Sequence, residues 1–158
     1  KKKEKETVNA VDMDNFSNLP YPIIIDPGAA ETVLPKGWCK QAEMPKDNSG
    51  RTYSAANGSQ IKNEGHKTVA MVARQGQWRN MTFQVCDVTK PLASVSKICE
   101  NGHSVVFNPS WDSRGSYIVS HETGEKIWLA PKDGVYVLET KIAPKKWQPK
   151  PGFARQGS

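Results

Sequence analysis

Short apolar runs separated by turn residues recur along the chain from residue 21 onward. Three isoleucines at positions 23 to 25 run directly into Asp26, and Met81, Phe83 and Val85 alternate with polar residues. Runs of β-branched residues and period-two alternation are typical of strands. The pattern therefore predicts an all-β fold, with further strands at 32–34, 67–73, 104–107, 117–119, 126–129 and 135–138.

Turn signals lie between most of these runs. Asn57-Gly58 is the strongest hairpin signal, because a type I′ turn needs positive φ at both central positions. Apolar residues at 92, 95, 98 and 99 have a helical spacing that stops at Asn101-Gly102, which predicts a loop followed by one short helix. Other turns are expected at Pro27-Gly28, Gly76-Gln77, 122–124 and Asp133-Gly134.

The length of 158 residues suits a single domain that can bury a sizeable core. Residues 1–19 are polar and unpatterned until Phe16 and Leu19, so we expect a flexible N-terminal arm that packs only near its end. Residues 20–140 hold the predicted strands and form the expected domain. Residues 141–158 contain three prolines, five basic residues and no acidic residue, which predicts a disordered basic tail.

The net charge of +6 lies almost entirely in that tail, because residues 1–19 carry four basic and four acidic residues and residues 20–140 carry thirteen and twelve. A basic tail with Trp147 and Phe153 could make weak contacts with nucleic acid, although a solvated tail is the more common case. No segment approaches the roughly 20 apolar residues of a membrane span, and no apolar stretch follows the lysine-rich start as in a signal peptide. If this start is the natural one, we expect a cytoplasmic protein without membrane contact.

The cysteines and histidines give little support to metal or nucleophilic chemistry. Cys39, Cys86 and Cys99 are widely separated, which is typical of a reducing compartment rather than a disulfide framework. Cys99 and His103 have a spacing that two zinc ligands could use, but no matching second pair exists, so no metal and no cofactor are expected. No serine-nucleophile motif occurs, and His66, His103 and His121 are predicted to be surface residues.

Asp26 is the most informative polar residue, because an apolar strand delivers its carboxylate to a turn. Desolvating that charge is unfavourable unless another group compensates. In one interpretation the side chain caps the Pro27-Gly28 turn, which is the more common role for an isolated Asp-Pro-Gly. In the other interpretation the carboxylate is catalytic, and motifs elsewhere in the chain are needed to choose between the two interpretations.

The ordered series of motifs resembles the retropepsin aspartic proteases, most closely the protease region of Copia-type retrotransposon polyproteins. Asp26-Pro27-Gly28-Ala29 stands at the family's Asp-Ser/Thr-Gly-Ala motif, and Ala55-Ala56-Asn57-Gly58-Ser59 is similar to its flap hairpin segment. Residues 92–99 are similar to its second apolar loop and helix, and residues 134–138 to the segment that leads toward the integrase. The resemblance covers roughly residues 20–140 and implies a retropepsin-like closed β-barrel or sandwich with a flap hairpin and one short helix.

The resemblance also implies an aspartic endopeptidase that acts on a polypeptide substrate. Two carboxylates held close together share one proton, so that one draws a proton from water while the other polarises the peptide carbonyl. The chain contains one Asp-X-Gly-Ala, so the second Asp26 would come from another copy in a homodimer. Ala55, Ala56, Asn57 and Gly58 would then form the flap that closes over substrate.

Pro27 departs from the family pattern at the centre of the motif. In the family this position is a serine or threonine whose hydroxyl forms hydrogen bonds across the dimer interface, and proline supplies neither a hydroxyl nor a backbone N–H. The alternative is therefore a catalytically inactive retropepsin-like module, domesticated or degenerate, that binds peptide or serves as a subunit of a larger assembly.

Overall fold

The structure is a computed structural model that describes residues 15–44, 52–54, 60–145 and 147. The described chain is mostly strand with one short helix, α2 (Val95–Glu100), so the all-β prediction is confirmed at that level. The strands are β1 (Ser17–Asn18), β2 (Ile23–Asp26), β3 (Val33–Pro35), β4 (Thr52–Ser54), β5 (Gln60–Ala73), β6 (Trp78–Cys86), β7 (Leu92–Ser94), β8 (His103–Val106), β9 (Ser116–Ser120), β10 (Lys126–Lys132), β11 (Val135–Leu138) and β12 (Thr140–Ile142).

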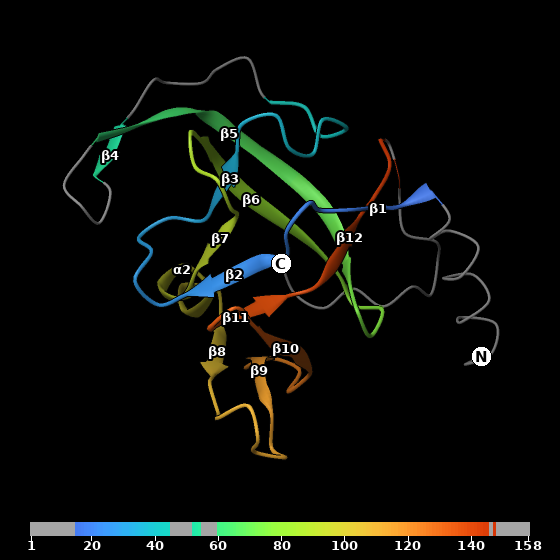
Figure 1. Ribbon diagram of the computed structural model, residues 1–158. Helices are drawn as coiled ribbons and strands as arrows, with labels where there is room; N and C mark the ends of the chain where they lie inside the picture. The colour runs from blue at the N-terminus through green and yellow to red at the C-terminus, as the bar shows by residue number, and fades with distance from the viewer. Residues whose placement is uncertain (1–14, 45–51, 55–59, 146, 148–158) are drawn as a thin grey trace.

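The strands form one sheet that curls into half a barrel (Figure 1). Its order is β1-β12-β5-β6-β3-β7-β2-β11-β10-β9-β8, with β4 paired to β5 beside this path. Within the described chain β1 and β8 are the two ends of the sheet and do not pair with each other. The sheet is therefore open, and the closed barrel that the resemblance implies is not what the described strands form.

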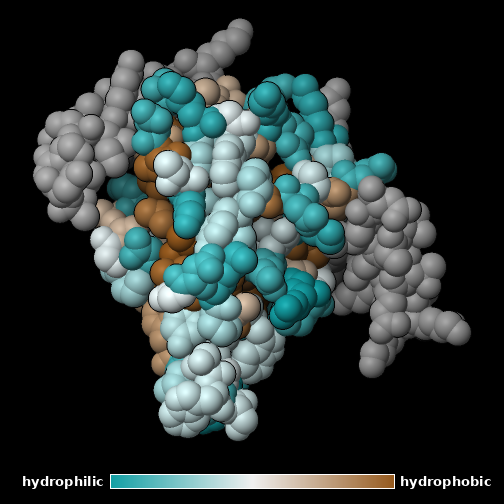
Figure 2. Space-filling view, in the orientation of Figure 1, coloured by the Kyte–Doolittle hydropathy of each residue, from teal (hydrophilic) through white to brown (hydrophobic). Residues whose placement is uncertain are grey.

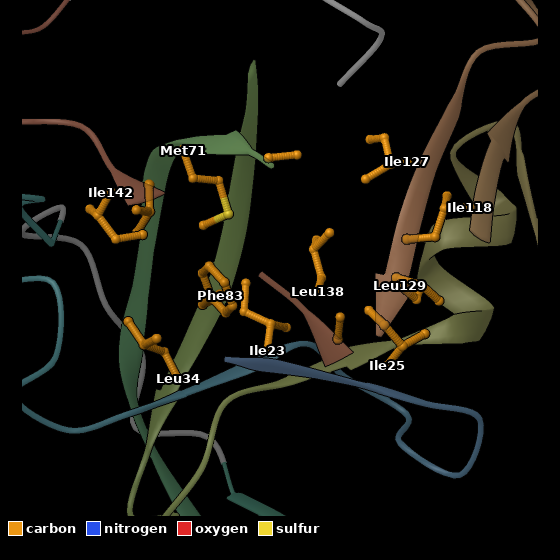
Figure 3. Close-up of a cluster of buried hydrophobic side chains, with 13 residues drawn as sticks. Ile23, Ile25, Leu34, Met71, Phe83, Ile118, Ile127, Leu129, Leu138 and Ile142 are labelled. Carbon is orange, nitrogen blue, oxygen red and sulfur yellow. The ribbon is translucent and has the colours of Figure 1, made fainter. Parts of the chain in front are cut away.

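Strand β2 lies in the middle of the sheet because both of its edges are paired. It runs parallel to β7 and antiparallel to β11. Ile23 and Ile25 are almost fully buried, whereas Ile24 and Asp26 are partly exposed, as alternation along a strand requires. The two isoleucines pack into a cluster with side chains of β5, β6, β9, β10 and β11, including Met71, Phe83 and Leu138 (Figure 3).

The helix prediction holds for residues 95–100, but the residues before it form a strand instead of a loop. Leu92–Ser94 pairs with β2 in the register Ile24 to Leu92 and Asp26 to Ser94, so strand pairing overrides the helical spacing of the apolar residues. Ser94 then caps α2, because its Oγ accepts a hydrogen bond from the Lys97 amide at 3.3 Å. The helix ends at Asn101, and Gly102 follows with a φ of 84°.

The folded part of the chain extends beyond residues 20–140 at both ends. Strand β12 lies between β1 and β5, and Ile142 is buried. The ring of Trp147 makes edge contacts with Phe16 and Trp78, with centroids 5.4 and 5.7 Å apart. The described part of 141–158 is thus packed, which corrects the prediction of a disordered tail for residues 141–145 and 147. Residues 1–14, 146 and 148–158 lie outside the described chain.

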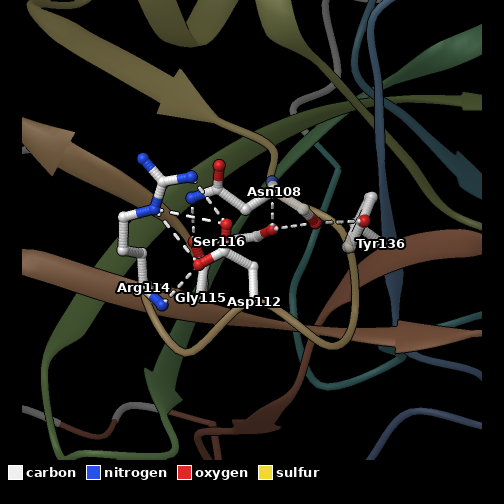
Figure 4. Close-up of polar contacts among 6 residues, drawn as sticks. All are labelled: Asn108, Asp112, Arg114, Gly115, Ser116 and Tyr136. Atoms are coloured by element: carbon white, nitrogen blue, oxygen red, sulfur yellow. Dashed lines mark hydrogen bonds and ion pairs between the residues drawn. The ribbon is translucent and has the colours of Figure 1, made fainter.

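The loop between β8 and β9 is held by polar contacts (Figure 4). The Ser116 hydroxyl accepts from the Asn108 amide at 2.8 Å and donates to the Asn108 carbonyl at 3.2 Å. The Tyr136 hydroxyl donates to the same carbonyl, and the Asn108 side chain donates to the Gly115 carbonyl at 2.6 Å. This network fixes a loop that carries Trp111, whose side chain is 82% exposed.

Candidate functional site

Asp26 lies where β2 ends and the chain turns at Pro27 and Gly28. The Gly28 amide donates to Asp26 Oδ1 at 2.8 Å, and the Ala29 amide donates to the Asp26 carbonyl at 3.3 Å. The carboxylate therefore caps the turn, as the first interpretation of this residue predicted. A Cβ added at Gly28 would lie 3.4 Å from Asp26 Oδ1, an ordinary contact, so steric crowding does not require the glycine here.

The turn is held against the strand that precedes α2. Asp26 pairs with Ser94 of β7, and the Ser94 amide donates to the Thr32 hydroxyl at 3.0 Å. The Thr32 carbonyl in turn accepts from the Gln84 amide of β6 at 2.8 Å. Strands β2, β6 and β7 therefore fix both ends of the segment that carries the motif, so its one carboxylate has a defined position.

The Asp26 carboxylate is only partly compensated by its surroundings. Among the described residues its hydrogen-bond partner is the Gly28 amide alone, and no cationic side chain lies within ion-pair distance. The side chain is partly exposed at the surface, and the neighbouring Pro27 is exposed. Proline brings no hydroxyl to the turn, so nothing at that position can hydrogen-bond the carboxylate. The second oxygen of Asp26 is thus positioned to accept a hydrogen bond or a proton from outside the described chain.

The predicted flap residues Ala55, Ala56, Asn57 and Gly58 lie outside the described residues. Strands on either side of them pair antiparallel, with Thr52 opposite Lys62 and Ser54 opposite Gln60. The chain therefore reverses direction between these strands, as the hairpin prediction requires. In Figure 1 the arm that β4 and β5 form projects on the side toward which β2 runs. Figure 2 shows apolar surface between this arm and the end of β2, near β3 and β7.

A cavity of about 660 Å³ opens inside the half-barrel, on the opposite side of β2 from the Asp26 carboxylate. Ile25 lines this cavity and Asp26 does not, because successive side chains of a strand point to opposite faces. Its floor is apolar, and its polar lining includes Arg79, Lys97 and His103. The turn and the cavity are thus two separate candidate sites, and sequence patterns indicated only the first.

His103 corrects the prediction that all three histidines are surface residues. It lies in β8, its side chain is 9% exposed, and it lines the cavity. Burial lowers the pKa of His103 below its ordinary value, and the positive charge of Arg79 lowers it further, against hydrogen bonds to the backbone of Asn101 and Ile98 that raise it. Of the other two, His66 is half-buried in β5, and His121 is exposed with its Nε2 2.7 Å from the Ser104 hydroxyl.

Cys39, Cys86 and Cys99 are free thiols, and burial raises the pKa of Cys39 to about 11. Within the described ranges no three His, Cys, Asp or Glu side chains gather closely enough to hold a metal ion. The one described helix is too short to cross a membrane.

No protein-family model, curated protein or solved structure matches the chain. The geometry of the Asp26 turn and the sequence motifs around it are therefore the basis for a function of this chain.

Proposed function

We propose that the protein is an aspartic endopeptidase that acts as a homodimer, with Asp26 of each copy activating a water molecule. The observation that carries the proposal is the position of Asp26. It is a partly exposed carboxylate at the end of a buried strand, with one oxygen on the Gly28 amide and no cation beside it among the described residues. Such a group is fixed in place and still has an oxygen with which to bind water.

One carboxylate is not sufficient for this chemistry, which needs one ionised and one protonated acid close together. The ionised acid takes a proton from water as the water attacks the peptide carbonyl, and the protonated acid donates a hydrogen bond to the carbonyl oxygen. Because the sequence has one Asp-X-Gly-Ala, the proposal assigns the second carboxylate to Asp26 of another copy, related by a two-fold axis. The apolar surface between the β4–β5 arm and the end of β2 suits the side chains of an extended polypeptide (Figure 2).

A second candidate is a non-catalytic module of the same kind, which binds peptide or forms part of a larger assembly. Pro27 favours it, because the exposed proline cannot provide the hydroxyl that braces the two copies in the proteases this chain resembles. The contact from Gly28 to Asp26 also gives the aspartate a structural role that needs no catalysis.

Cleavage of a peptide library at acidic to neutral pH distinguishes the two candidates. Wild-type protein should cleave, a pepstatin-type inhibitor should stop it, and Asp26→Asn should be inactive although the asparagine can still accept the Gly28 hydrogen bond. Asp87→Asn makes the same change at an exposed carboxylate outside the Asp26–Ala29 motif and serves as the matched control. Equal inactivity of wild type and Asp26→Asn, with sedimentation showing a dimer, would reject the protease and leave the non-catalytic module.

Mixing experiments test whether the two carboxylates come from different copies. If each active site needs two Asp26 side chains, wild type mixed and re-equilibrated with excess Asp26→Asn should lose activity with the square of the wild-type fraction. A linear loss would mean that one copy suffices.

Pro27→Thr should strengthen dimerisation and raise activity, since it restores a hydroxyl at an exposed turn position. Unchanged dimerisation and activity would show that the hydroxyl has no bracing role here.

A further inference from the structure

Strand β6 has one edge that is only partly paired. Its other edge pairs with β5 along its whole length, whereas β3 pairs with it only from Gln84 to Cys86. The Gln84 amide donates to the Thr32 carbonyl at 2.8 Å, so the main-chain groups of Gln84 face the β3 side. Because this direction alternates along a strand, the N–H and C=O groups of Asn80 and Thr82 face the same side. No described strand pairs with them there.

The open stretch of this edge is short and has definite ends. At one end the Trp78 carbonyl, which faces the same side, accepts from Arg79 Nη1 at 3.1 Å. At the other end Thr32 already accepts from the Gln84 amide. Residues 80–82 lie between, and they include no proline, no lysine and no register shift, which are common devices that protect a strand edge. The edge therefore offers an N–H and a C=O from each of two residues to an added strand.

The cavity inside the half-barrel lies beside this edge. Asn80, Met81 and Thr82 line it, and its floor includes Ile25 and Leu138. Figure 3 shows the side chains of Ile25 and Leu138 directed toward the inside of the curled sheet. Paired residues of neighbouring strands point to the same face, so a residue opposite Met81 in an added strand would direct its side chain into the cavity. A volume of about 660 Å³ has room for a large apolar side chain there.

Helix α2 forms a further wall of the cavity and supplies more hydrogen-bond donors. Lys97, Ile98 and Asn101 line the cavity from α2 and its C-cap. Lys97 Nζ lies 3.9 Å from Glu100, but the two side chains are 44% and 68% exposed, so that pair is weak and the ammonium group can also bind carbonyl oxygens. The Asn101 side chain adds an amide donor. These groups favour an extended polypeptide over a compact ligand, which would leave the β6 edge unpaired.

We propose that the open edge of β6 binds an extended polypeptide segment of a partner protein, which adds a strand at residues 80–82 and places one apolar side chain in the cavity. Strand addition of this kind takes affinity from main-chain hydrogen bonds and specificity from pockets for alternate side chains. The site is independent of the proposed protease chemistry, because Ile25 lines the cavity and Asp26 does not.

Fluorescence anisotropy of a labelled heptapeptide, Ser-Thr-Thr-Leu-Thr-Thr-Ser with blocked ends, tests the proposal on the full chain. The β-branched threonines favour an extended conformation, and the central leucine is the apolar side chain for the cavity. Replacing the leucine by alanine should weaken binding by at least about tenfold, because burial of a leucine side chain contributes that much or more to affinity. Absence of binding, or equal binding of the leucine and alanine peptides, would overturn the proposal.

Methylation of the peptide nitrogens tests for the strand itself. Alternate N–H groups of an added strand face β6, and the others face away. One peptide is methylated at the leucine nitrogen, and a second at the nitrogens of the two threonines that flank the leucine. One of the two should bind at least about fivefold more weakly than the other, because it loses main-chain hydrogen bonds that the other keeps. Equal affinities of the two methylated peptides would reject an added strand without the need for any variant.

Thr82→Pro locates the added strand on β6. Proline removes an N–H that faces the open edge and leaves the ladder with β5 intact, so the leucine peptide should bind at least about fivefold more weakly. Thr68→Pro is the matched control. Thr68 pairs with Thr82, and both variants break the same 2.8 Å contact between the two hydroxyl groups, but the Thr68 amide faces the other edge of the β5–β6 hairpin.

Near-UV circular dichroism and the urea midpoint show whether each proline variant is folded. Peptide affinity should be unchanged in Thr68→Pro. Equal affinity of folded Thr82→Pro and wild type, or an equal loss in both folded proline variants, would contradict the proposal.

Two further measurements separate this site from the Asp26 turn and from self-association. Asp26→Asn and a pepstatin-type inhibitor should leave the affinity for the leucine peptide unchanged, whether or not the protein is a protease. Displacement of the peptide by the inhibitor would place the peptide at the proposed protease site and reject the β6 edge. Weaker peptide binding as the protein concentration rises would mean that a second copy takes the edge, which also rejects a partner protein as its occupant.

Discussion

Arg114 holds the carboxylate of Asp112 through its side chain and its backbone amide, with the closest contact 2.6 Å from Nη2 to Oδ2. These hydrogen bonds lower the pKa of Asp112 to about 2. A carboxyl group whose pKa is lower in the folded state stabilises the fold above its unfolded pKa of about 3.9, and this stabilisation is lost as the pH falls from about 4 toward 2. Asp112→Asn should therefore destabilise the protein at neutral pH, and the difference from wild type should shrink as the pH approaches 3 (about one unit above the folded pKa). Urea midpoints measured across this range check the prediction, and a difference independent of pH would contradict it.

Single residues could be assigned from the sequence only where a local pattern surrounds them. Asp26 was identifiable because three isoleucines and a Pro-Gly turn frame it. Arg79 and His103 were not, because β6 and β8 lie far apart in the sheet order and only the curl of the sheet brings the two residues to one cavity. His103 follows Asn101-Gly102, which has the composition of a turn, so its burial in β8 has no local signal.

The loop between β8 and β9 should owe its shape to Ser116 rather than to its most conspicuous residue, Trp111. Ser116→Ala would remove both contacts to Asn108 and leave a partly buried amide without its partner, so the free energy of unfolding should fall by about 1–2 kcal/mol. Trp111→Ala changes a side chain that is 82% exposed and should alter the free energy of unfolding by less than about 0.5 kcal/mol. Urea unfolding of the two variants gives both values. A larger effect of Trp111→Ala would mean that the indole, not the polar network, stabilises the loop.

Elements with a long enough pattern were predictable, and the short strands β7 and β12 were not. The sequence indicated β2, β6, β9, β10 and β11 because alternation or β-branched runs mark them, and Asp133 and Gly134 adopt the positive φ values of 53° and 82° that their turn requires. Strands β7 and β12 have three residues each, and pairing with β2 and β5 decides their conformation. Local propensity has little influence over so short a segment.

The curvature of the sheet and the cavity inside it belong to the whole molecule. Ile25, Ile118 and Leu138 lie far apart in the sequence, and the pairing of their strands together with the curl of the sheet gathers them around one cavity. The limits of the domain also depend on contacts between residues that lie far apart in the sequence. A basic, proline-containing composition favours disorder, yet Trp147 packs against residues near the other end of the described chain. Composition averages over a segment and cannot show that one residue within it is anchored.

Trp147 should stabilise the fold by linking the N-terminal and C-terminal ends of the described chain to the β5–β6 hairpin. Its ring contacts Phe16 near the start of the described chain and Trp78 at the start of β6, in a cluster that also contains Val72 and Ala143. Because the indole is only partly buried, Trp147→Ala should lower the free energy of unfolding by about 2 kcal/mol, less than the 3–5 kcal/mol of a fully buried aromatic residue.

Hydrogen exchange should also report this loss, since β12 and β1 depend on the same cluster to stay on the edge of β5. Their amides should exchange faster in Trp147→Ala, while those of β9 and β10, at the other end of the sheet, keep their wild-type rates. Trp111→Ala controls for the loss of an indole as such. If Trp147→Ala unfolds at the wild-type urea concentration with unchanged exchange in β12, the C-terminal segment contributes nothing to the fold, and the domain ends near residue 140 as composition alone would place it.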